Sequence, residues 1–164
     1  VEYLRTTQLQ DGSWWGRWGT NYVYGTWSAL AGLALVGEDR QQPYIRKAIE
    51  WLYACQNADG GWGETNDSYL DPALAGRNQG QSTPNHTAWA LLGLIAIGEA
   101  DHPAVARGIE HLLATQQADG LWHHPSHNAP GFPRVYYLKY HGYTAYFPLW
   151  ALSQYRRLRS ASAP

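Results

Sequence analysis

Aromatic side chains are the residues of this sequence with the clearest chemical potential. The 164 residues include nine Trp and twelve Tyr but only two Phe, which is more indole and phenol than a plain core requires. Phe132, Tyr136 and Tyr140 recur at every fourth position, so they share one face in a helix or a strand, and Tyr143 joins them in a helix. An aromatic face stabilises positive charge by about 0.5–2 kcal/mol. Taken alone, however, the spacing favours core packing over a binding site.

Groups that usually carry acid, base or metal chemistry are sparse. Asp67 and Asp71 form a weak carboxylate pair on a polar loop, for which simple solvation is the better interpretation. His123, His124 and His127 lie close together, but no Cys or carboxylate with metal-ligand spacing accompanies them. We therefore expect no metal site.

Composition narrows the possible classes of function further. The net charge of −1 gives no electrostatic footprint for nucleic acid. The single cysteine, Cys55, excludes an internal disulfide framework and is interpreted as a small core hydrophobe. His86 and His141 are expected to be satisfied by local hydrogen bonds. No apolar run reaches the length of about 18 residues that a membrane span requires.

A repeated motif provides the framework for these residues. The pattern Gln-x-x-Asp-Gly-x-Trp occurs at 8–14, 56–62 and 116–122, and three copies indicate a repeat architecture. Asp-Gly favours a tight turn, the Gln amide can both donate to and accept from nearby backbone, and Trp offers a broad packing face. We interpret the motif residues as structural staples: Gln8, Trp14, Gln56, Trp62, Gln116 and Trp122.

Amphipathic and wholly apolar segments alternate along the chain. The amphipathic segments end at each motif glutamine, and the apolar helices are predicted at about 22–36, 84–97 and 143–158. Pro148 is expected to kink the last helix or delay its start. A two-layer ring explains the alternation, with amphipathic helices outside and apolar helices inside. The sequence thus predicts an all-α fold, an incomplete α/α barrel (toroid) over residues 1–158, with residues 159–164 as a disordered tail.

The repeats resemble the QW motifs of the triterpene cyclases. Three further stretches narrow the resemblance to the bacterial squalene–hopene cyclases: DGSWWGRWGTNYVYGT at 11–26, STPNHTAWAL at 82–91 and GFPRVYYLKY at 131–140. The ending YFPLWAL at 146–152 is similar to that family's C-terminal helix, so the resemblance covers essentially the whole chain. It implies the C-terminal quarter of a longer enzyme with two α/α barrel domains. Such enzymes cyclise squalene to hopene through a carbocation cascade without a cofactor.

The resemblance also implies roles for individual aromatic residues. Four of them match cavity aromatics that guide formation of the later rings: Phe132, Tyr136, Tyr140 and Tyr143. Trp18 resembles an aromatic near the protonation end of the cavity, and Tyr24 resembles a residue that supports the acid through water; both have plain core packing as their alternative. The family usually has Phe where this chain has Tyr136, so the resemblance leaves the product open between hopene, hopanol and others.

The family's general acid belongs to an Asp-x-Asp-Asp motif, and the sequence contains none. We therefore expect no catalytic residue in this stretch and an acid that lies upstream. The expected partners are squalene, the upstream part of the same enzyme and, through that enzyme, the inner face of a bacterial cell membrane, with the protein monotopic on the cytoplasmic side. An incomplete ring leaves apolar helices uncovered, which predicts self-association through the open barrel edge.

Three alternatives stay open. An oxidosqualene-type cyclase shares the fold and the aromatic strategy and differs in its acid motif. A zinc protein prenyltransferase is another α/α toroid with Asp-Gly-Gly-Trp turns, but it needs a Cys ligand, and Cys55 lies in a helix beside a motif Gln. The third alternative is a catalytically inactive repeat module.

Overall fold

The computed structural model describes residues 1–161, and helices dominate this part of the chain. A two-stranded antiparallel hairpin and two short 3-10 helices lie in the connections. In chain order the elements are α1 (Glu2–Thr7), α2 (Tyr22–Leu35), α3 (Pro43–Ala54), η1 (Asn66–Tyr69), η2 (Pro72–Leu74), α4 (Pro84–Ala96), α5 (Pro103–Thr115), β1 (Ala129–Phe132), β2 (Tyr136–Leu138) and α6 (Tyr143–Ala161).

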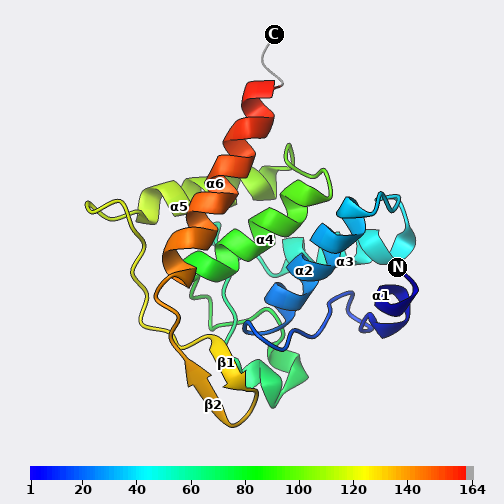
Figure 1. Ribbon diagram of the computed structural model, residues 1–164, viewed down its shortest axis with the longest axis horizontal. Coiled ribbons are helices and arrows are strands. Elements are labelled where there is room, and N and C mark those ends of the chain that lie inside the picture. Colours follow the sequence, from blue (N-terminus) through cyan, green and yellow to red (C-terminus); the bar gives the residue numbers. More distant parts are fainter. Residues whose placement is uncertain (162–164) are drawn as a thin grey trace.

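The helices form two layers of an incomplete α/α ring, as predicted. The inner layer consists of α2, α4 and α6, with α4 between the other two (Figure 1). The outer layer consists of α1, α3 and α5, of which α3 packs on α2 and α5 on α4. Because α4 has neighbours on both sides and an outer helix behind it, all its residues from Pro84 to Ile95 are buried. In α6, at the edge of the layer, only Pro148 and Ala151 are buried.

Local sequence signals account for the helix ends. A proline occupies the first position of α3, α4 and α5, where its missing amide hydrogen costs nothing and its fixed φ suits the helix. Thr83 caps α4, because its Oγ1 accepts a hydrogen bond from His86 N at 3.2 Å. None of the helices within residues 1–161 has both the length and the apolar content that crossing a bilayer requires.

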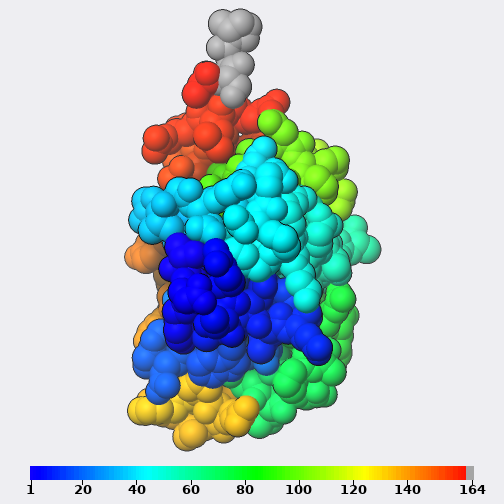
Figure 2. Space-filling model, turned by 90° about the vertical axis from the view of Figure 1, so that its right-hand side faces the viewer, coloured from blue at the N-terminus to red at the C-terminus, as the bar shows by residue number. Residues whose placement is uncertain are grey.

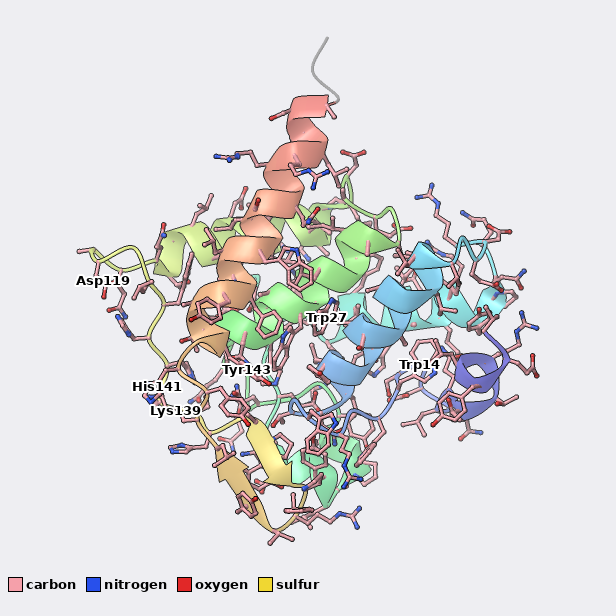
Figure 3. The ribbon with its side chains drawn as sticks, viewed as in Figure 1. Trp14, Trp27, Asp119, Lys139, His141 and Tyr143 are labelled. Carbon is pink, nitrogen blue, oxygen red and sulfur yellow. The ribbon has the colours of Figure 1, made fainter. Side chains whose placement is uncertain are left out.

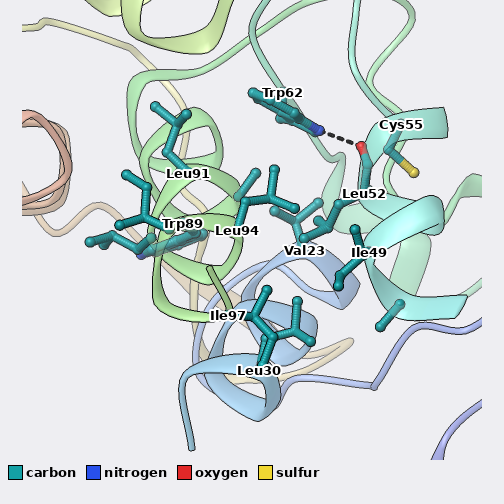
Figure 4. Packing of buried hydrophobic residues seen from close by; sticks show 14 of the residues in the cluster. Val23, Leu30, Ile49, Leu52, Cys55, Trp62, Trp89, Leu91, Leu94 and Ile97 are labelled. Carbon is teal, nitrogen blue, oxygen red and sulfur yellow. Dashed lines mark hydrogen bonds between the residues drawn. The ribbon is translucent and has the colours of Figure 1, made fainter. Parts of the chain in front are cut away.

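The motif tryptophans join the end of each outer helix to the core. Each indole Nε1 donates to a backbone carbonyl ten residues earlier: Trp14 to Leu4 at 2.8 Å, Trp62 to Leu52 at 2.7 Å and Trp122 to Leu112 at 2.8 Å. Figure 4 shows the second of these bonds at the centre of the core, where Trp62 is fully buried. The tryptophans therefore tie the last turn of each outer helix to the core, although Leu52 O and Leu112 O also accept a backbone N–H from the cap of their own helix.

The motif glutamines join one outer helix to the next. Gln8 Nε2 donates to Gly12 O in its own turn at 2.8 Å and to Tyr44 O, at the start of α3, at 2.7 Å. Gln56 Nε2 repeats this arrangement with Gly60 O and with Ala104 O, at the start of α5, both at 2.8 Å. Gln8 and Gln56 thus each tie their own turn to the start of the next outer helix.

The third motif lacks the neighbour that the first two have. Gln116 Nε2 donates to Gly120 O at 2.8 Å, and no second carbonyl within the described residues accepts from it. The turn glycines show the same difference. A Cβ at Gly60 would lie 2.7 Å from Arg107 O of the next outer helix, whereas a Cβ at Gly120 would meet nothing within 4 Å. The ring is therefore open beyond the third motif.

The structure decides two choices that the sequence left open and corrects one expectation. The aromatic tract after Gly131 is extended and forms part of the β1–β2 hairpin, because Pro130 and Pro133 lack the amide hydrogens that a helix interior needs. Pro148 does not delay α6, which begins at Tyr143. The disordered tail predicted from residue 159 is wrong for residues 159–161, which continue α6, and Arg159 there pairs with Asp101 Oδ1 at 2.6 Å. The rest of that tail, 162–164, lies outside the described residues.

Gln56 and Gln116 differ in the number of hydrogen bonds they make, so the pair provides a matched test of the stapling role. We expect Gln56→Met to lower the free energy of unfolding by about 1–3 kcal/mol, because it removes one hydrogen bond within the turn and two to α5, at Ala104 O and at the Arg107 side chain. Gln116→Met should lower it by about 1 kcal/mol or less, because only one bond within a turn is lost. Urea unfolding of the two variants measures the difference, and equal losses would contradict the interpretation.

Candidate functional site

The three connections that follow the motifs converge at one end of the molecule. They cover residues 15–21, 63–83 and 123–142 and lead into the first turns of α2, α4 and α6 respectively (Figure 1). The helices η1 and η2 and the β1–β2 hairpin belong to these connections. The predicted cavity residues Trp18, Phe132, Tyr136 and Tyr140 lie in these connections, so this end of the inner layer is the candidate site.

A polar network, buried at Thr20, Asn85 and Asn128, ties the three connections together. Thr20 N donates to Asn128 O at 3.0 Å, and the Thr20 hydroxyl donates to the Asn66 side chain. Asn66 Nδ2 in turn donates to His127 O at 2.7 Å. Asn128 Nδ2 donates to Asn85 Oδ1, in the first turn of α4, at 3.0 Å. Each connection is therefore held by the other two and by an inner helix.

His86 adds a second tie between α4 and the first connection. It is fully buried, with Nε2 at 2.5 Å from Thr20 O and Nδ1 at 2.6 Å from Thr83 Oγ1. These partners assign the neutral tautomer, in which Nε2–H donates to the carbonyl and Nδ1 accepts from the hydroxyl. Burial lowers the pKa of His86 to about 3, although the bond to Thr20 opposes this shift. The predicted local hydrogen bonding of His86 holds for Nδ1, whereas Nε2 bonds Thr20, 66 positions away in the chain.

Glu64, which the sequence reasoning did not single out, caps α2 from the second connection. Its Oε1 accepts from Tyr22 N at 3.0 Å and its Oε2 from Val23 N at 2.8 Å. Asn21, at the N-cap position itself, makes no side-chain capping bond. Burial raises the pKa of Glu64 against the opposing effect of these backbone bonds. A lone acid directly after a motif Gly-Trp-Gly was the sequence signal that could have identified it.

Trp89 of α4 is the centre of an aromatic cluster that includes two predicted site residues. Its ring is fully buried and makes edge contacts with Tyr24 at 5.1 Å, Phe147 at 5.4 Å and Tyr143 at 5.7 Å between ring centroids. Tyr140 contacts Tyr143 at 5.1 Å. Burial, with smaller effects of the Tyr24 and Tyr140 phenols, raises the pKa of Tyr143 to about 12. The structure thus brings Tyr24, Tyr140 and Tyr143 together through a tryptophan that sequence reasoning placed only in a helix.

A second tryptophan extends this cluster. Trp27 of α2 stacks on Trp89 at 6.2 Å, and it approaches α4 from the side opposite to Tyr143 of α6 (Figure 3). Trp27 also contacts Phe147 and Trp150 of α6 at 5.5 and 6.1 Å. The cluster therefore connects all three inner helices. Trp27 and Trp89 both pack against Tyr24, and Trp89 also packs against Tyr143.

Phe132 and Tyr136 form a separate aromatic pair on the hairpin. They are register partners in β1 and β2, and their rings meet edge to face at 5.8 Å. About half of each side chain is exposed, 53% for Phe132 and 46% for Tyr136. The hairpin therefore presents two aromatic rings outward instead of burying them in the core.

Trp18 lies in a third position, at the open α1 edge. It is 52% exposed, and the Arg17 guanidinium lies 5.1 Å from its ring centroid. Trp18 and Tyr24 line the same pocket of about 420 Å³ between α1, the glycine-spaced loop and α2. Trp14 and Trp15 contribute further aromatic walls, and Arg17 is the one charged residue lining the pocket. The two residues predicted near the protonation end thus share a pocket without a carboxylate.

The remaining polar candidates have structural partners. His123 pairs with Asp119, which projects at the edge of the molecule, and His124 bonds Ser126 (Figure 3). Asp71 Oδ1 caps η2 through Ala73 N at 2.9 Å, and Asp67 lies within the first turn of η1. Among residues 1–161 no three His, Cys, Asp or Glu side chains come together as a metal ligand set would.

The candidate site can therefore interact with a ligand mainly through the faces of its aromatic rings. Several rings are half exposed, while the buried Glu64 and His86 already have hydrogen-bond partners on both of their polar atoms. Burial raises the pKa of the Cys55 thiol to about 12, which disfavours the thiolate that a zinc site requires. Such a surface can stabilise positive charge in an apolar ligand. The pocket shared by Trp18 and Tyr24 is lined by no carboxylate among the described residues.

Comparison with known proteins gives consistent matches over the whole chain. Residues 1–157 match the family described as squalene-hopene cyclase C-terminal domain. A probable squalene–hopene cyclase from Sinorhizobium fredii is 57% identical over 99% of this chain and 25% of the relative. A squalene–hopene cyclase from Bradyrhizobium diazoefficiens is 56% identical over 99% and 24%, and a dammaradiene synthase from Dryopteris crassirhizoma is 43% identical over 98% and 25%. The chain spans about a quarter of the length of these curated relatives.

The buried histidine makes stability depend on pH. The unfolded state takes up a proton near pH 6.5, whereas folded His86 stays neutral down to about pH 3. Its contribution is therefore complete above pH 6.5 and is lost as the pH falls, by about 1.4 kcal/mol per pH unit. Urea unfolding at pH 7, 6 and 5 should show a shallower pH dependence for His86→Gln than for the unmodified chain. Replacing the exposed His141 by Gln serves as the control, and identical slopes for His86→Gln and the unmodified chain would contradict the assignment.

Proposed function

Because the chain belongs to the squalene–hopene cyclase family, through its C-terminal domain, we propose that it forms the C-terminal part of an enzyme that cyclises squalene to a pentacyclic triterpene. The observation that carries this proposal is a set of outward-facing aromatic rings, with no carboxylate lining the pocket that Trp18 and Tyr24 share. The names of the matching relatives favour squalene over oxidosqualene as the substrate. The parent enzyme is accordingly an isomerase of the triterpene cyclase type.

In this proposal the chain supplies the wall along which carbocations form and migrate. A carboxylate or a water molecule at that wall would quench a cation, whereas an aromatic face stabilises it by about 0.5–2 kcal/mol. Phe132 and Tyr136 on the hairpin, with Tyr140 and Tyr143 at the start of α6, are the residues assigned to the later rings. Trp18 is assigned to the opposite end of the reaction path, where the cascade begins.

The acid that starts the cascade is assigned to a part of the enzyme outside these 164 residues. The sequence contains no Asp-x-Asp-Asp motif, and both oxygens of the buried Glu64 cap α2. Tyr24 has a supporting role toward that acid. It faces the same pocket as Trp18, and burial raises its pKa, so it remains a neutral hydrogen-bonding group.

The product is proposed to be hopene or hopanol, with Tyr136 as the position most able to change it. The Tyr136 ring meets the Phe132 ring edge to face, so its hydroxyl adds a polar atom to the part of the wall assigned to the later cations. One relative is named a dammaradiene synthase, so this domain occurs in proteins named for different products.

The partners follow from the open ring. α6 exposes 74% of Tyr146 and 63% of Leu149, and α1 lies uncovered on the side of the molecule that Figure 2 faces. We propose that the upstream part of the same enzyme covers these surfaces. We also place the complete protein on the cytoplasmic face of a bacterial membrane, in which squalene dissolves. Without that cover the chain is expected to self-associate.

A squalene incubation tests the assigned division of roles. The chain alone should give no cyclic triterpene, because it lacks the acid, and its mixture with the upstream part should give cyclic products on gas chromatography. The upstream part alone is the control, and it should give none because half of the cavity wall is missing. Turnover by the chain alone would show that an acid lies within it, with Asp67 and Asp71 tested first.

Sedimentation tests the self-association. At micromolar concentration the unmodified chain should sediment as an oligomer, and Leu149→Glu should shift it toward the monomer by placing a charge on the open α6 edge. Leu70→Glu, at an equally exposed leucine after η1, should leave the oligomer unchanged. A monomeric unmodified chain would contradict the proposal.

A further inference from the structure

Tyr69, the last residue of η1, has a buried side chain at the meeting point of two connections. Only 2% of the residue is exposed. Its ring lies against Trp15 of the first connection, edge to face at 5.9 Å, and against Tyr137 of the hairpin at 6.0 Å. A tyrosine in a polar loop carries no sequence signal for such a place, and nothing in the proposed reaction uses it directly.

The hydroxyl of Tyr69 holds the loop that carries Trp18. It lies 2.7 Å from Gly16 O and 2.9 Å from Gly19 O, and the single phenol proton can be shared between the two carbonyls. Burial raises the pKa of Tyr69, so the hydroxyl keeps this proton. Because the two carbonyls flank Arg17 and Trp18, one side chain fixes both ends of the segment that presents the Trp18 ring.

The same loop rests directly on Tyr24. A Cβ added at Gly19 would lie 2.3 Å from the Tyr24 ring, so the backbone of the loop and that ring are in close contact. A loop that moved away from Tyr69 would therefore uncover Tyr24 as well as displace Trp18. Both residues assigned to the protonation end depend on the placement of this loop.

The backbone of Tyr69 holds the hairpin. Arg134 Nε donates to Tyr69 O at 2.6 Å, and Arg134 N donates to the hydroxyl of Tyr137, the residue against the Tyr69 ring, at 3.1 Å. Arg134 occupies the turn between Phe132 and Tyr136. The two rings assigned to the later cations are thus anchored to the same residue as the Trp18 loop.

We propose that Tyr69 is a positioning residue that sets the Trp18 and Tyr24 end of the aromatic wall relative to the Phe132 and Tyr136 end. This inference rests on the proposed cyclase function for its consequence. Stabilising a cation that migrates along a wall requires ring positions held to within about half an ångström, and the residues that hold them are those locked by packing and hydrogen bonds. Tyr69 uses its ring, hydroxyl and backbone carbonyl for this purpose.

The test replaces only the hydroxyl. Tyr69→Phe keeps the ring but removes both contacts to the glycine carbonyls. In the complete enzyme we expect the share of incompletely cyclised products to rise severalfold on gas chromatography. Tyr53→Phe is the matched control, because the Tyr53 hydroxyl bonds Glu99 Oε2 at 2.8 Å in the outer layer. It should lose a similar bond without changing the product ratio.

A second measurement does not depend on turnover. In the 164-residue chain, amide hydrogen exchange at Gly16 and Thr20, whose N–H groups bond Asn21 and Asn128, should become about five to ten times faster in Tyr69→Phe and stay unchanged in Tyr53→Phe. If Tyr69→Phe does not fold, Arg134→Gln replaces it. That variant breaks only the hairpin tie and should speed exchange at Val135, whose N–H bonds Phe132 O.

The outcomes separate the two proposals. If the unmodified complete enzyme makes no cyclic product, the proposed function fails, and the exchange rates still decide whether Tyr69 positions the loop. Unchanged exchange at Gly16 and Thr20 in Tyr69→Phe, or at Val135 in its substitute, overturns the positioning role. Faster exchange with an unchanged product ratio overturns its link to the reaction and leaves Tyr69 a structural residue.

Discussion

The architecture depends on the hydrogen bond from each motif indole to a carbonyl near the end of the outer helix that precedes it. This bond recurs at 2.7–2.8 Å in all three motifs, always ten residues apart. It sets where the chain leaves the outer layer and therefore where the next inner helix can begin. In the first two motifs the backbone N–H of the same Trp bonds a threonine of that inner helix, Thr26 or Thr87. In these two motifs a single Trp thus bonds a carbonyl of the outer helix through its indole and fixes the start of the next inner helix through its backbone N–H.

The candidate site follows from this placement of the starts of the inner helices. With the inner helices starting at the same end, their connections meet there, and their polar groups bond one another through Thr20, Glu64 and His86. Polar atoms satisfied inside the protein are not available to the surface. The faces that remain are aromatic, which suits an apolar substrate that carries positive charge. The physical basis of the proposed function is therefore the separation of a buried polar network from an exposed aromatic wall.

The helices and the motif contacts could be predicted from the sequence, but the arrangement of the site residues could not. The helices and the staples rest on periodicity, turn chemistry and motif spacing, which are local properties. The choice of aromatic site residues rests instead on the resemblance to the triterpene cyclases. The grouping of those residues was not predictable. Tyr24 and Tyr143 contact Trp89, Tyr140 contacts Tyr143, Phe132 pairs with Tyr136, and Trp18 shares a pocket with Tyr24. These groupings depend on which elements pack together, and the sequence contains no signal for this.

The sequence by itself determined the two-layer repeat, the stapling role of each Gln and Trp, and the shortage of free acid or base groups, because each follows from residue types and their spacing. Only the tertiary structure decided that Glu64 caps a helix from another repeat, that Tyr69 links the Trp18 loop to the hairpin, and that the ring is open beyond Gln116. Those contacts join residues far apart in the chain, such as Tyr69 and Arg134, 65 positions apart, or Thr20 and Asn128, 108 apart. These contacts form only once the two layers have packed, because that packing brings both partners within reach of each other.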